Sequence, residues 1–256
     1  MPGAEGEAAL LARDTDADWA KLGVSNPYWG VISHPDFLAE NITPERVEQF
    51  YESGPFHIGP IAKDIERLTG KPPSGRALDF GCGVGRLAEA MKTYCAEVTG
   101  VDVSPGMLAL ARARNRGVNY VDRIPDGPFD WINSFIVFQH IPPARGEGII
   151  EELLSRLAPG GVASLQVIVW RDPNREWPPE TGWRRLFAAQ LRRKRLRALP
   201  VGHILMYDYD LSRVARLFNL AGIEEIRLVS TNHDGHHGYI ILGQKTAPPT
   251  APTTAA

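Results

Sequence analysis

The chain has 256 residues, of which 43% are hydrophobic and 23% are charged. These proportions are typical of a globular protein with a buried core, and they exclude a wholly disordered, collagen-like or coiled-coil chain. Its 28 Lys and Arg residues against 30 Asp and Glu residues give a formal charge of −2, so no overall field favours nucleic acid or an anionic membrane.

The cysteine count and the hydropathy of the sequence indicate in which cellular compartment the protein works. Cys82 and Cys95 are too few for a disulfide framework or a four-thiolate zinc site. The first 15 residues lack the basic start and apolar run of a secretory signal. No apolar stretch approaches the ~18 residues that a membrane-spanning helix needs. We therefore expect a soluble cytoplasmic protein with no membrane partner.

The N-terminal part, residues 1–74, is expected to be a tail followed by an appended helical segment. Periodic apolar residues predict helices over 44–51 and 60–68, and the Pro-Pro-Ser-Gly sequence at 72–75 marks a boundary. Four aromatic residues of this segment could cover a ligand or form its own core: Trp29, Phe50, Tyr51 and Phe56.

After residue 75 short apolar runs alternate with helical periodicity, which predicts a βαβ array with a parallel sheet. The expected strands are 77–80, 97–101, 119–121, 131–137 and 162–169, and the expected helices are 85–94, 105–116 and 145–157. Pro159-Gly160-Gly161 should close the third helix. We expect this core to span 75–245.

An insertion without strand signals is expected at about 171–205. Between positions 184 and 197 it contains a run of seven basic residues: Arg184, Arg185, Arg192, Arg193, Lys194, Arg195 and Arg197. A solvated charged face explains such a run best, and binding of phosphate, carboxylate or RNA is the alternative. The core then resumes with a helix over 211–221 and strands over 226–230 and 239–244, which should pair antiparallel because no crossover helix fits between them. Residues 246–256 should be a disordered tail.

The most informative stretch is Leu78 to Arg86, where a strand ends and a helix begins. Gly81, Gly83 and Gly85 let the backbone turn sharply and approach a ligand, and the helix start presents free N–H groups. A dinucleotide-binding loop would have its third glycine at 86, where Arg86 stands. The carboxylate of Asp79 suits an ammonium group better than a pyrophosphate.

These residues resemble the first motif of the class I S-adenosylmethionine-dependent methyltransferases. The resemblance continues through Val101-Asp102, through the stretch from Phe129 to Pro142, and through the turn at 157–161. It implies a Rossmann-like α/β fold with a mostly parallel seven-stranded sheet and an antiparallel last strand. Because independent features coincide in the right order, the resemblance is stronger than the glycine motif alone.

The resemblance also implies roles for particular residues. The three glycines would cradle the methionine portion of S-adenosylmethionine, Asp102 would hold its ribose, and Asp122 would contact its adenine. The whole expected cofactor-binding set is Asp79, Gly81, Cys82, Gly83, Gly85, Asp102, Val103, Asp122 and Ser134.

Candidate acceptor-side residues are histidines. His140, just beyond the fourth strand, could act as a general base near neutral pH, or could be a packing histidine. His233, His236 and His237 lie in a loop on the same side, where they could bind the acceptor or a metal, or form a solvated hairpin. We place no metal in the predicted site.

The fourth strand is followed by Ser134-Phe135-Ile136-Val137 rather than by the Asn/Asp-Pro-Pro-Tyr/Phe sequence of enzymes that methylate nucleobase or amide nitrogens. We therefore expect methylation of a small polar metabolite, more at oxygen than at nitrogen, by in-line displacement. The alternatives are an RNA or protein methyltransferase that uses the basic run, a non-catalytic cofactor-binding module and, more distantly, a dinucleotide oxidoreductase. The oligomeric state is left open.

Overall fold

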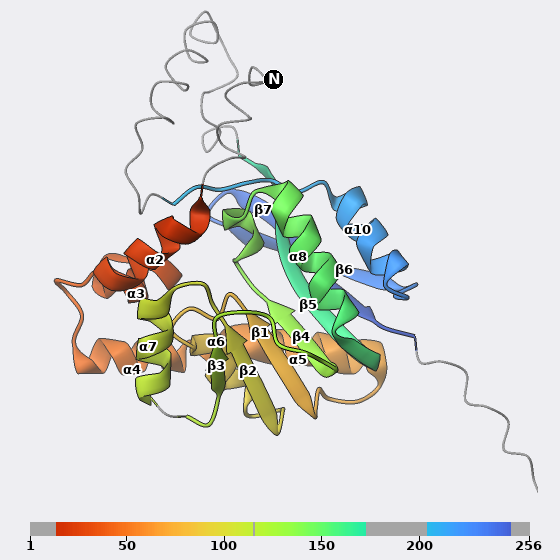
Figure 1. Cartoon of the computed structure of the whole chain (residues 1–256), viewed down its shortest axis with the longest axis horizontal. Helices are drawn as coiled ribbons and strands as arrows, with labels where there is room; N and C mark the ends of the chain where they lie inside the picture. The colour runs from red at the N-terminus through yellow and green to blue at the C-terminus, as the bar shows by residue number, and fades with distance from the viewer. Residues whose placement is uncertain (1–13, 115, 173–203, 247–256) are drawn as a thin grey trace, which may run out of the picture.

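A seven-stranded sheet in the order β3-β2-β1-β4-β5-β7-β6 forms the centre of the computed structural model, which describes residues 14–114, 116–172 and 204–246 (Figure 1). Strands β1 to β5 pair parallel, whereas β7 pairs antiparallel with both β5 and β6. The strands are β1 (Arg76–Phe80), β2 (Glu97–Val101), β3 (Asn119–Val121), β4 (Phe129–Ser134), β5 (Leu157–Arg171), β6 (Ile226–His233) and β7 (His236–Gln244). The predicted seven-stranded, mostly parallel sheet with its antiparallel last strand is confirmed.

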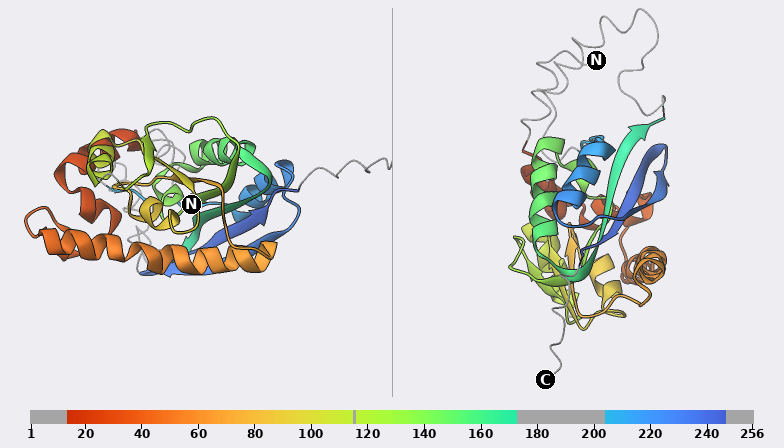
Figure 2. Two further views of the ribbon diagram at one scale, coloured as in Figure 1. Left: turned by 90° about the horizontal axis from the view of Figure 1, so that it is seen from below. Right: turned by 90° about the vertical axis from the view of Figure 1, so that its right-hand side faces the viewer.

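Helices cover both faces of this sheet, and α5 and α8 lie on opposite faces (Figure 2). One core cluster joins the sheet to α5 (Gly54–Thr69), α6 (Arg86–Met91) and α7 (Pro105–Arg114). The other cluster joins it to α8 (Pro143–Ser155) and α10 (Leu211–Leu220). Each amphipathic helix therefore buries one apolar stripe against the strands.

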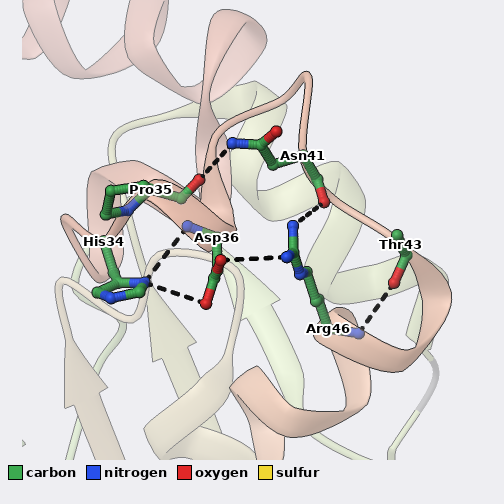
Figure 3. A network of polar contacts seen from close by, with 6 residues as sticks. All are labelled: His34, Pro35, Asp36, Asn41, Thr43 and Arg46. Carbon is green, nitrogen blue, oxygen red and sulfur yellow. Dashed lines mark hydrogen bonds and ion pairs between the residues drawn. The ribbon is translucent and has the colours of Figure 1, made fainter.

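The remaining N-terminal helices are α2 (Thr15–Ser25), α3 (Pro27–Val31), η1 (Pro35–Phe37) and α4 (Pro44–Glu52). Polar contacts fix the turns between η1 and α4 (Figure 3). Arg46 pairs with Asp36 at 3.1 Å and donates to the carbonyl of Asn41, while Thr43 caps α4 by accepting from the backbone N–H of Arg46. A third core cluster packs Phe50 and Tyr51 of α4 against Val84 and Met107.

Several element boundaries differ from the sequence prediction. Strands β6 and β7 extend into the predicted histidine loop, and two other differences involve proline or glycine. Helix α5 begins at Gly54 and runs through Pro60, because the apolar face that packs on the sheet continues on both sides of that proline and outweighs one missing backbone hydrogen bond. Helix α8 ends at Ser155, and the Pro-Gly-Gly stretch lies inside β5. There Gly160 and Gly161 exchange backbone hydrogen bonds with Lys245.

The expectations for the N-terminal aromatic residues, the insertion and the C-terminal tail can be compared with the structure only in part. Phe50 and Tyr51 are buried core residues, whereas Phe56 is 81% exposed, so these three belong to the packing or the surface of the N-terminal segment. Most of the predicted insertion, with its whole basic run, and the C-terminal tail lie outside the described residues. No helix in the part of the chain that the structure describes is long and apolar enough to cross a membrane.

Candidate active site

A cavity that opens to solvent lies at the carboxyl ends of β1, β2 and β4. In open α/β sheets this edge is where ligands bind. Helices α2 and α3 cover it from one side and the start of α8 from another. Its lining is Thr15, Asp16, Trp19, Gly30, Val31, Asp79, Phe80, Gly81, Cys82, Gly83, Arg86, Leu87, Val101, Asp102, Val103, Met107, Phe135, Ile136, Val137, His140, Ile141 and Arg145.

The floor of the cavity is the turn between β1 and α6. The backbone N–H groups of Gly81 and Cys82 both donate to the carbonyl of Val101, at 2.8 and 2.9 Å. Gly81 and Gly83 have φ values of 74° and 55°, and a Cβ on Gly81 would overlap the side chain of Val137. Glycine is therefore required at this turn by backbone conformation and by close packing, as well as by the space a ligand needs.

Asp79 ends a chain of buried hydrogen bonds that crosses three strands. Trp131 donates to Ser164, Ser164 donates to Asn133, and Asn133 donates to Oδ1 of Asp79, each at 2.8 Å. The other carboxylate oxygen, Oδ2, is buried and has no partner among the described residues. Burial raises the pKa of Asp79 to about 7, although the Asn133 hydrogen bond and the charge of Arg86 oppose the shift.

Asp102, one residue past β2, holds the turn in place with both carboxylate oxygens. Oδ2 accepts from the backbone N–H of Gly83 and Oδ1 from that of Ser104, each at 2.8 Å. Burial raises the pKa of Asp102, and these two hydrogen bonds counteract the shift. Beside it, Val103 is 39% exposed and also lines the cavity.

Arg86, the first residue of α6, places a buried cation beside Asp79. Its Nη1 lies 3.1 Å from Oγ of Ser53 and 3.0 Å from Nδ1 of His57, and its guanidinium lies 5.7 Å from the ring centre of Phe50. Burial lowers the pKa of Arg86 to about 10, and the charge of Asp79 opposes that shift. Nε has no partner among the described residues, so one donor remains available.

The covering helix α2 is fastened to α8 across the cavity. Asp16 accepts two hydrogen bonds from Arg145, at 2.8 and 2.6 Å. One turn later, the ring of Trp19 meets that of His140 edge to face with centroids 5.0 Å apart. Both pairs line the cavity, so separating them would open it between α2 and α8.

The structure gathers most of the predicted cofactor-binding residues at the cavity but leaves three away from its lining. Asp122 has a 69% exposed side chain and pairs with Arg123. Ser134 is buried, and its Oγ has no partner among the described residues. Gly85 caps α6 and packs against Tyr120. Asp122 directly follows the short strand β3.

Of the four predicted acceptor-side histidines, His140 alone lines the cavity. Its Nδ1 lies 2.9 Å from the carbonyl of Leu205 and its Nε2 lies 3.2 Å from Nε2 of Gln139. Burial lowers its pKa to about 4, so it is neutral near pH 7. His237 stacks on Trp170, with ring centres 3.7 Å apart, and lies 2.9 Å from Asp172. The described residues contain no group of three or more metal-ligating side chains arranged for a metal ion.

Several lining residues were not singled out from the sequence. Arg86 adjoins the glycine motif, so its position after the third glycine was an available signal. Asp16, Trp19 and Arg145 carry no such local signal, because only the packing of α2 on α8 brings them to the cavity.

Comparison with known protein families shows to which family the chain belongs. A family model described as "Methyltransferase domain" matches residues 56–225, which is well over half of the chain. The chain belongs to this methyltransferase family. S-adenosylmethionine is the cofactor of the family, and the class I methyltransferase fold predicted from the glycine, acid and strand motifs is the one observed.

Curated relatives of this methyltransferase match part of the chain. The ubiquinone biosynthesis O-methyltransferase of Xanthomonas campestris pv. campestris (strain B100) is 32% identical over 126 residues, which cover 44% of this chain and 52% of that protein. The trans-aconitate 2-methyltransferase of Rhizobium rhizogenes (strain K84 / ATCC BAA-868) is 35% identical over 99 residues, which cover 36% and 38%. The match thus spans about half or less of these relatives' own length.

Solved structures share the fold of this methyltransferase over most of its length. Magnesium protoporphyrin IX methyltransferase from Synechocystis PCC 6803, with bound SAH, superposes with a TM-score of 0.60 at 14% identity and covers 91% of this chain and 100% of that one. The amino pentose methyltransferase CalS10 from Micromonospora echinaspora, with bound SAM, gives a TM-score of 0.55 at 20% identity and covers 80% and 98%.

The residues at the cavity fit the cofactor of the family. Asp79 supplies an unpartnered acceptor and Arg86 an unpartnered donor, which together complement the ammonium and carboxylate of an amino acid. The glycine turn leaves backbone close to the cavity, and Asp102 contributes a carboxylate to its lining. A buried unpaired polar atom is costly, so a ligand that completes these hydrogen bonds would be stabilised.

Proposed function

We propose that this methyltransferase transfers the methyl group of S-adenosylmethionine to an oxygen atom of a small molecule in the cytoplasm. The observation that carries the proposal is the orphaned Oδ2 of Asp79 beside the glycine turn, inside a covered cavity. The free, buried thiols of Cys82 and Cys95 fit a reducing compartment.

In this proposal each cavity residue has a distinct task toward the cofactor. Asp79 accepts a hydrogen bond from its ammonium group, and Nε of Arg86 donates to its carboxylate. Gly81, Cys82 and Gly83 present backbone to the methionine portion. Asp102 accepts from the ribose hydroxyls, and Val103 flanks the adenosyl group. Asp122 and Ser134 are not part of this set because neither lines the cavity.

When bound, S-adenosylmethionine supplies a methyl group on a positively charged sulfur, which an aligned nucleophile displaces. The residues of the chain then have to orient the acceptor and exclude water. Trp19 and Val31 cover the cavity, and Phe135 and Val137 form an apolar wall next to the turn. These side chains keep the reacting groups in a desolvated volume.

The relatives support a small acceptor and an oxygen nucleophile. One is named for O-methylation in ubiquinone biosynthesis and another for methylation of trans-aconitate. Asp16 and Arg145 hold helix α2 over the cavity. A substrate enclosed beneath this helix would have to be small. We extend these activities to this chain on the strength of the matched part of each relative alone.

Label transfer tests the proposal. The enzyme is incubated with methyl-labelled S-adenosylmethionine and a whole extract that is separated afterwards into small molecules, protein and nucleic acid. We expect label in the small-molecule fraction as a methyl ether or ester, and none with the Asp102→Ala variant. Label that accumulates in RNA or protein, or as N-methyl groups, would contradict the proposal.

A further inference from the structure

The start of α5 holds the side chain of Arg86 from outside the cavity lining. Arg86 lines the cavity, whereas Ser53 and His57 do not. Both nevertheless contact Nη1 of Arg86, because Oγ of Ser53 lies 3.1 Å from it and Nδ1 of His57 lies 3.0 Å from it. Two side chains outside the lining therefore restrain one that belongs to it.

Packing leaves this contact little freedom. A Cβ on Gly54, the first residue of α5, would lie 2.6 Å from the carbonyl oxygen of Arg86, so the starts of α5 and α6 abut closely. The ring of Phe50 lies 5.7 Å from the guanidinium. Phe135, which lines the cavity, contacts the ring of His57 at a centroid distance of 5.4 Å. His57 thus lies behind the cavity wall, and Arg86 links it to the cavity.

The guanidinium of Arg86 has one engaged nitrogen and one unpartnered nitrogen. The residue is 4% exposed, and its Nη1 has the two contacts at the start of α5. Its Nε is buried and has no partner among the described residues. A buried N–H without an acceptor is costly, so the direction of this N–H matters for what the cavity binds. Nε is also the donor that the proposed function assigns to the carboxylate of the cofactor.

The contact with Arg86 determines which nitrogen of His57 carries the proton. A guanidinium donates hydrogen bonds and never accepts them, so Nδ1 of His57 accepts from Nη1 and carries no proton. In a neutral imidazole the proton then lies on Nε2. The carbonyl of Ser53 lies 3.1 Å from the same Nδ1. The opposite tautomer would donate to this carbonyl and would place its N–H against an N–H of Arg86.

The charges around His57 keep its ring in the neutral, accepting form. Burial lowers the pKa of His57, and the guanidinium of Arg86 lowers it further. His233 of β6 also interacts electrostatically with His57, and burial lowers the pKa of His233 as well. Both imidazoles are therefore neutral near pH 7, and Arg86 carries the positive charge.

We infer that His57 is a positioning residue that directs Nε of Arg86 to the carboxylate of the cofactor's methionine portion. The inference rests on the proposed function and deepens its account of cofactor recognition. His57 does not touch the cofactor; it accepts at Nη1 together with Ser53 and so leaves Nε for the ligand. Without His57, the guanidinium would be free to turn toward the carboxylate of Asp79, whose charge attracts it.

Two ligands that differ only in the carboxylate test the inference. S-adenosylhomocysteine has an amine and a carboxylate, and decarboxylated S-adenosylhomocysteine keeps the amine alone. Calorimetry should show that His57→Leu weakens S-adenosylhomocysteine binding about tenfold, because Arg86 loses an acceptor that fixes it. The affinity for the decarboxylated ligand should stay unchanged. General damage to the fold would instead weaken the binding of both ligands.

Further variants separate the hydrogen bond from the bulk of the ring. In His57→Asn the amide oxygen takes the place of Nδ1 and accepts from Arg86, so its affinity for S-adenosylhomocysteine should stay close to that of the wild type. In an Arg86→Met background, His57→Leu should cause no further loss, because the two residues act as one unit. His34→Leu, which changes an exposed histidine of the N-terminal segment, is the matched control and should bind both ligands like the wild type.

Nitrogen NMR tests the tautomer in the wild type and does not depend on the stability of His57→Leu. In protein with labelled histidine and bound S-adenosylhomocysteine, the signal of His57 is identified by its absence in His57→Asn. We expect Nε2 of His57 to be protonated and Nδ1 to be bare.

Several results would overturn the inference. In folded variants these are equal losses for the two ligands in His57→Leu, no loss at all, a further loss in the Arg86→Met background, or binding by His57→Asn as weak as that by His57→Leu. In the wild type it is a proton on Nδ1 of His57. Each leaves the proposed function intact, because the wild type still binds S-adenosylhomocysteine. A folded wild type that does not bind S-adenosylhomocysteine would instead contradict the proposed function itself.

Discussion

At the scale of single residues, the buried carboxyl of Asp79 sets the chemistry of the cavity. Its surroundings penalise the charged form, and the folded-state pKa of about 7 lies above the ordinary value of 3.8. The folded protein therefore binds more protons than the unfolded chain between these values, and this group makes stability fall as pH rises from about 4 to 7. A ligand ammonium would supply the opposite charge that the ionised form lacks.

Affinity for S-adenosylhomocysteine should consequently rise with pH. If the ammonium of the ligand binds ionised Asp79, a pKa near 7 predicts about a tenfold gain in affinity between pH 6 and pH 8. Isothermal titration calorimetry at several pH values measures this gain. In Asp79→Asn the affinity should be lower and nearly independent of pH; a wild-type affinity that is flat over this range would contradict the role given to Asp79.

Asp102 both lines the ligand cavity and stabilises the glycine turn. Asp102→Ala leaves the N–H groups of Gly83 and Ser104 without their acceptor, so we expect a loss of about 1–3 kcal/mol in the free energy of unfolding. We also expect at least a hundredfold loss in S-adenosylhomocysteine affinity. Denaturant unfolding and calorimetry on the same variant measure the two effects, and a wild-type affinity in a folded variant would remove Asp102 from the site.

At the scale of elements, α2 acts as a cover held by one ion pair. The side chains of Asp16 and Arg145 are 41% and 43% exposed, so the pair contributes little to global stability. Because both side chains line the cavity, breaking the pair should affect ligand release more than folding.

Arg145→Met should therefore speed the dissociation of S-adenosylhomocysteine several-fold while the free energy of unfolding changes by less than about 1 kcal/mol. Stopped-flow displacement measures the rate. The matched control is Arg213→Met, which breaks a similar bidentate pair away from the cavity. Arg213 pairs with Glu147, which lies on α8 as Arg145 does. Equal release rates in the two variants would show that the Asp16 pair does not hold the cover.

The strands contribute through the buried chain of hydrogen bonds from Trp131 to Asp79. Ser164→Ala leaves Trp131 without its acceptor and Asn133 without its donor, which should cost about 1–3 kcal/mol of stability. Because Asn133 orients Asp79, S-adenosylhomocysteine affinity should also fall. Urea unfolding measures the loss of stability, and calorimetry measures the loss of affinity. An unchanged affinity would show that these buried hydrogen bonds do not contribute to ligand binding.

At the scale of the whole molecule, the sequence predicted what depends on local pattern. The glycine turn, the acid after β2 and the mostly parallel sheet with its antiparallel last strand follow from short motifs and the resemblance they carry, and the structure reproduces them. Helix α5 passes through Pro60 because tertiary packing outweighs a local helix breaker. The pairs Asp16–Arg145 and His57–Phe135 join residues that are far apart in the sequence, so no local pattern could indicate them.

The measurement that tests the account most directly is titration of the folded protein with S-adenosylhomocysteine. We predict binding of one molecule per chain in the wild type, and its near loss in Asp102→Ala under conditions where circular dichroism shows both proteins folded. If the folded wild type produces no binding heat with S-adenosylhomocysteine or S-adenosylmethionine at several temperatures, the cavity is not an adenosyl-cofactor site and the functional account is wrong.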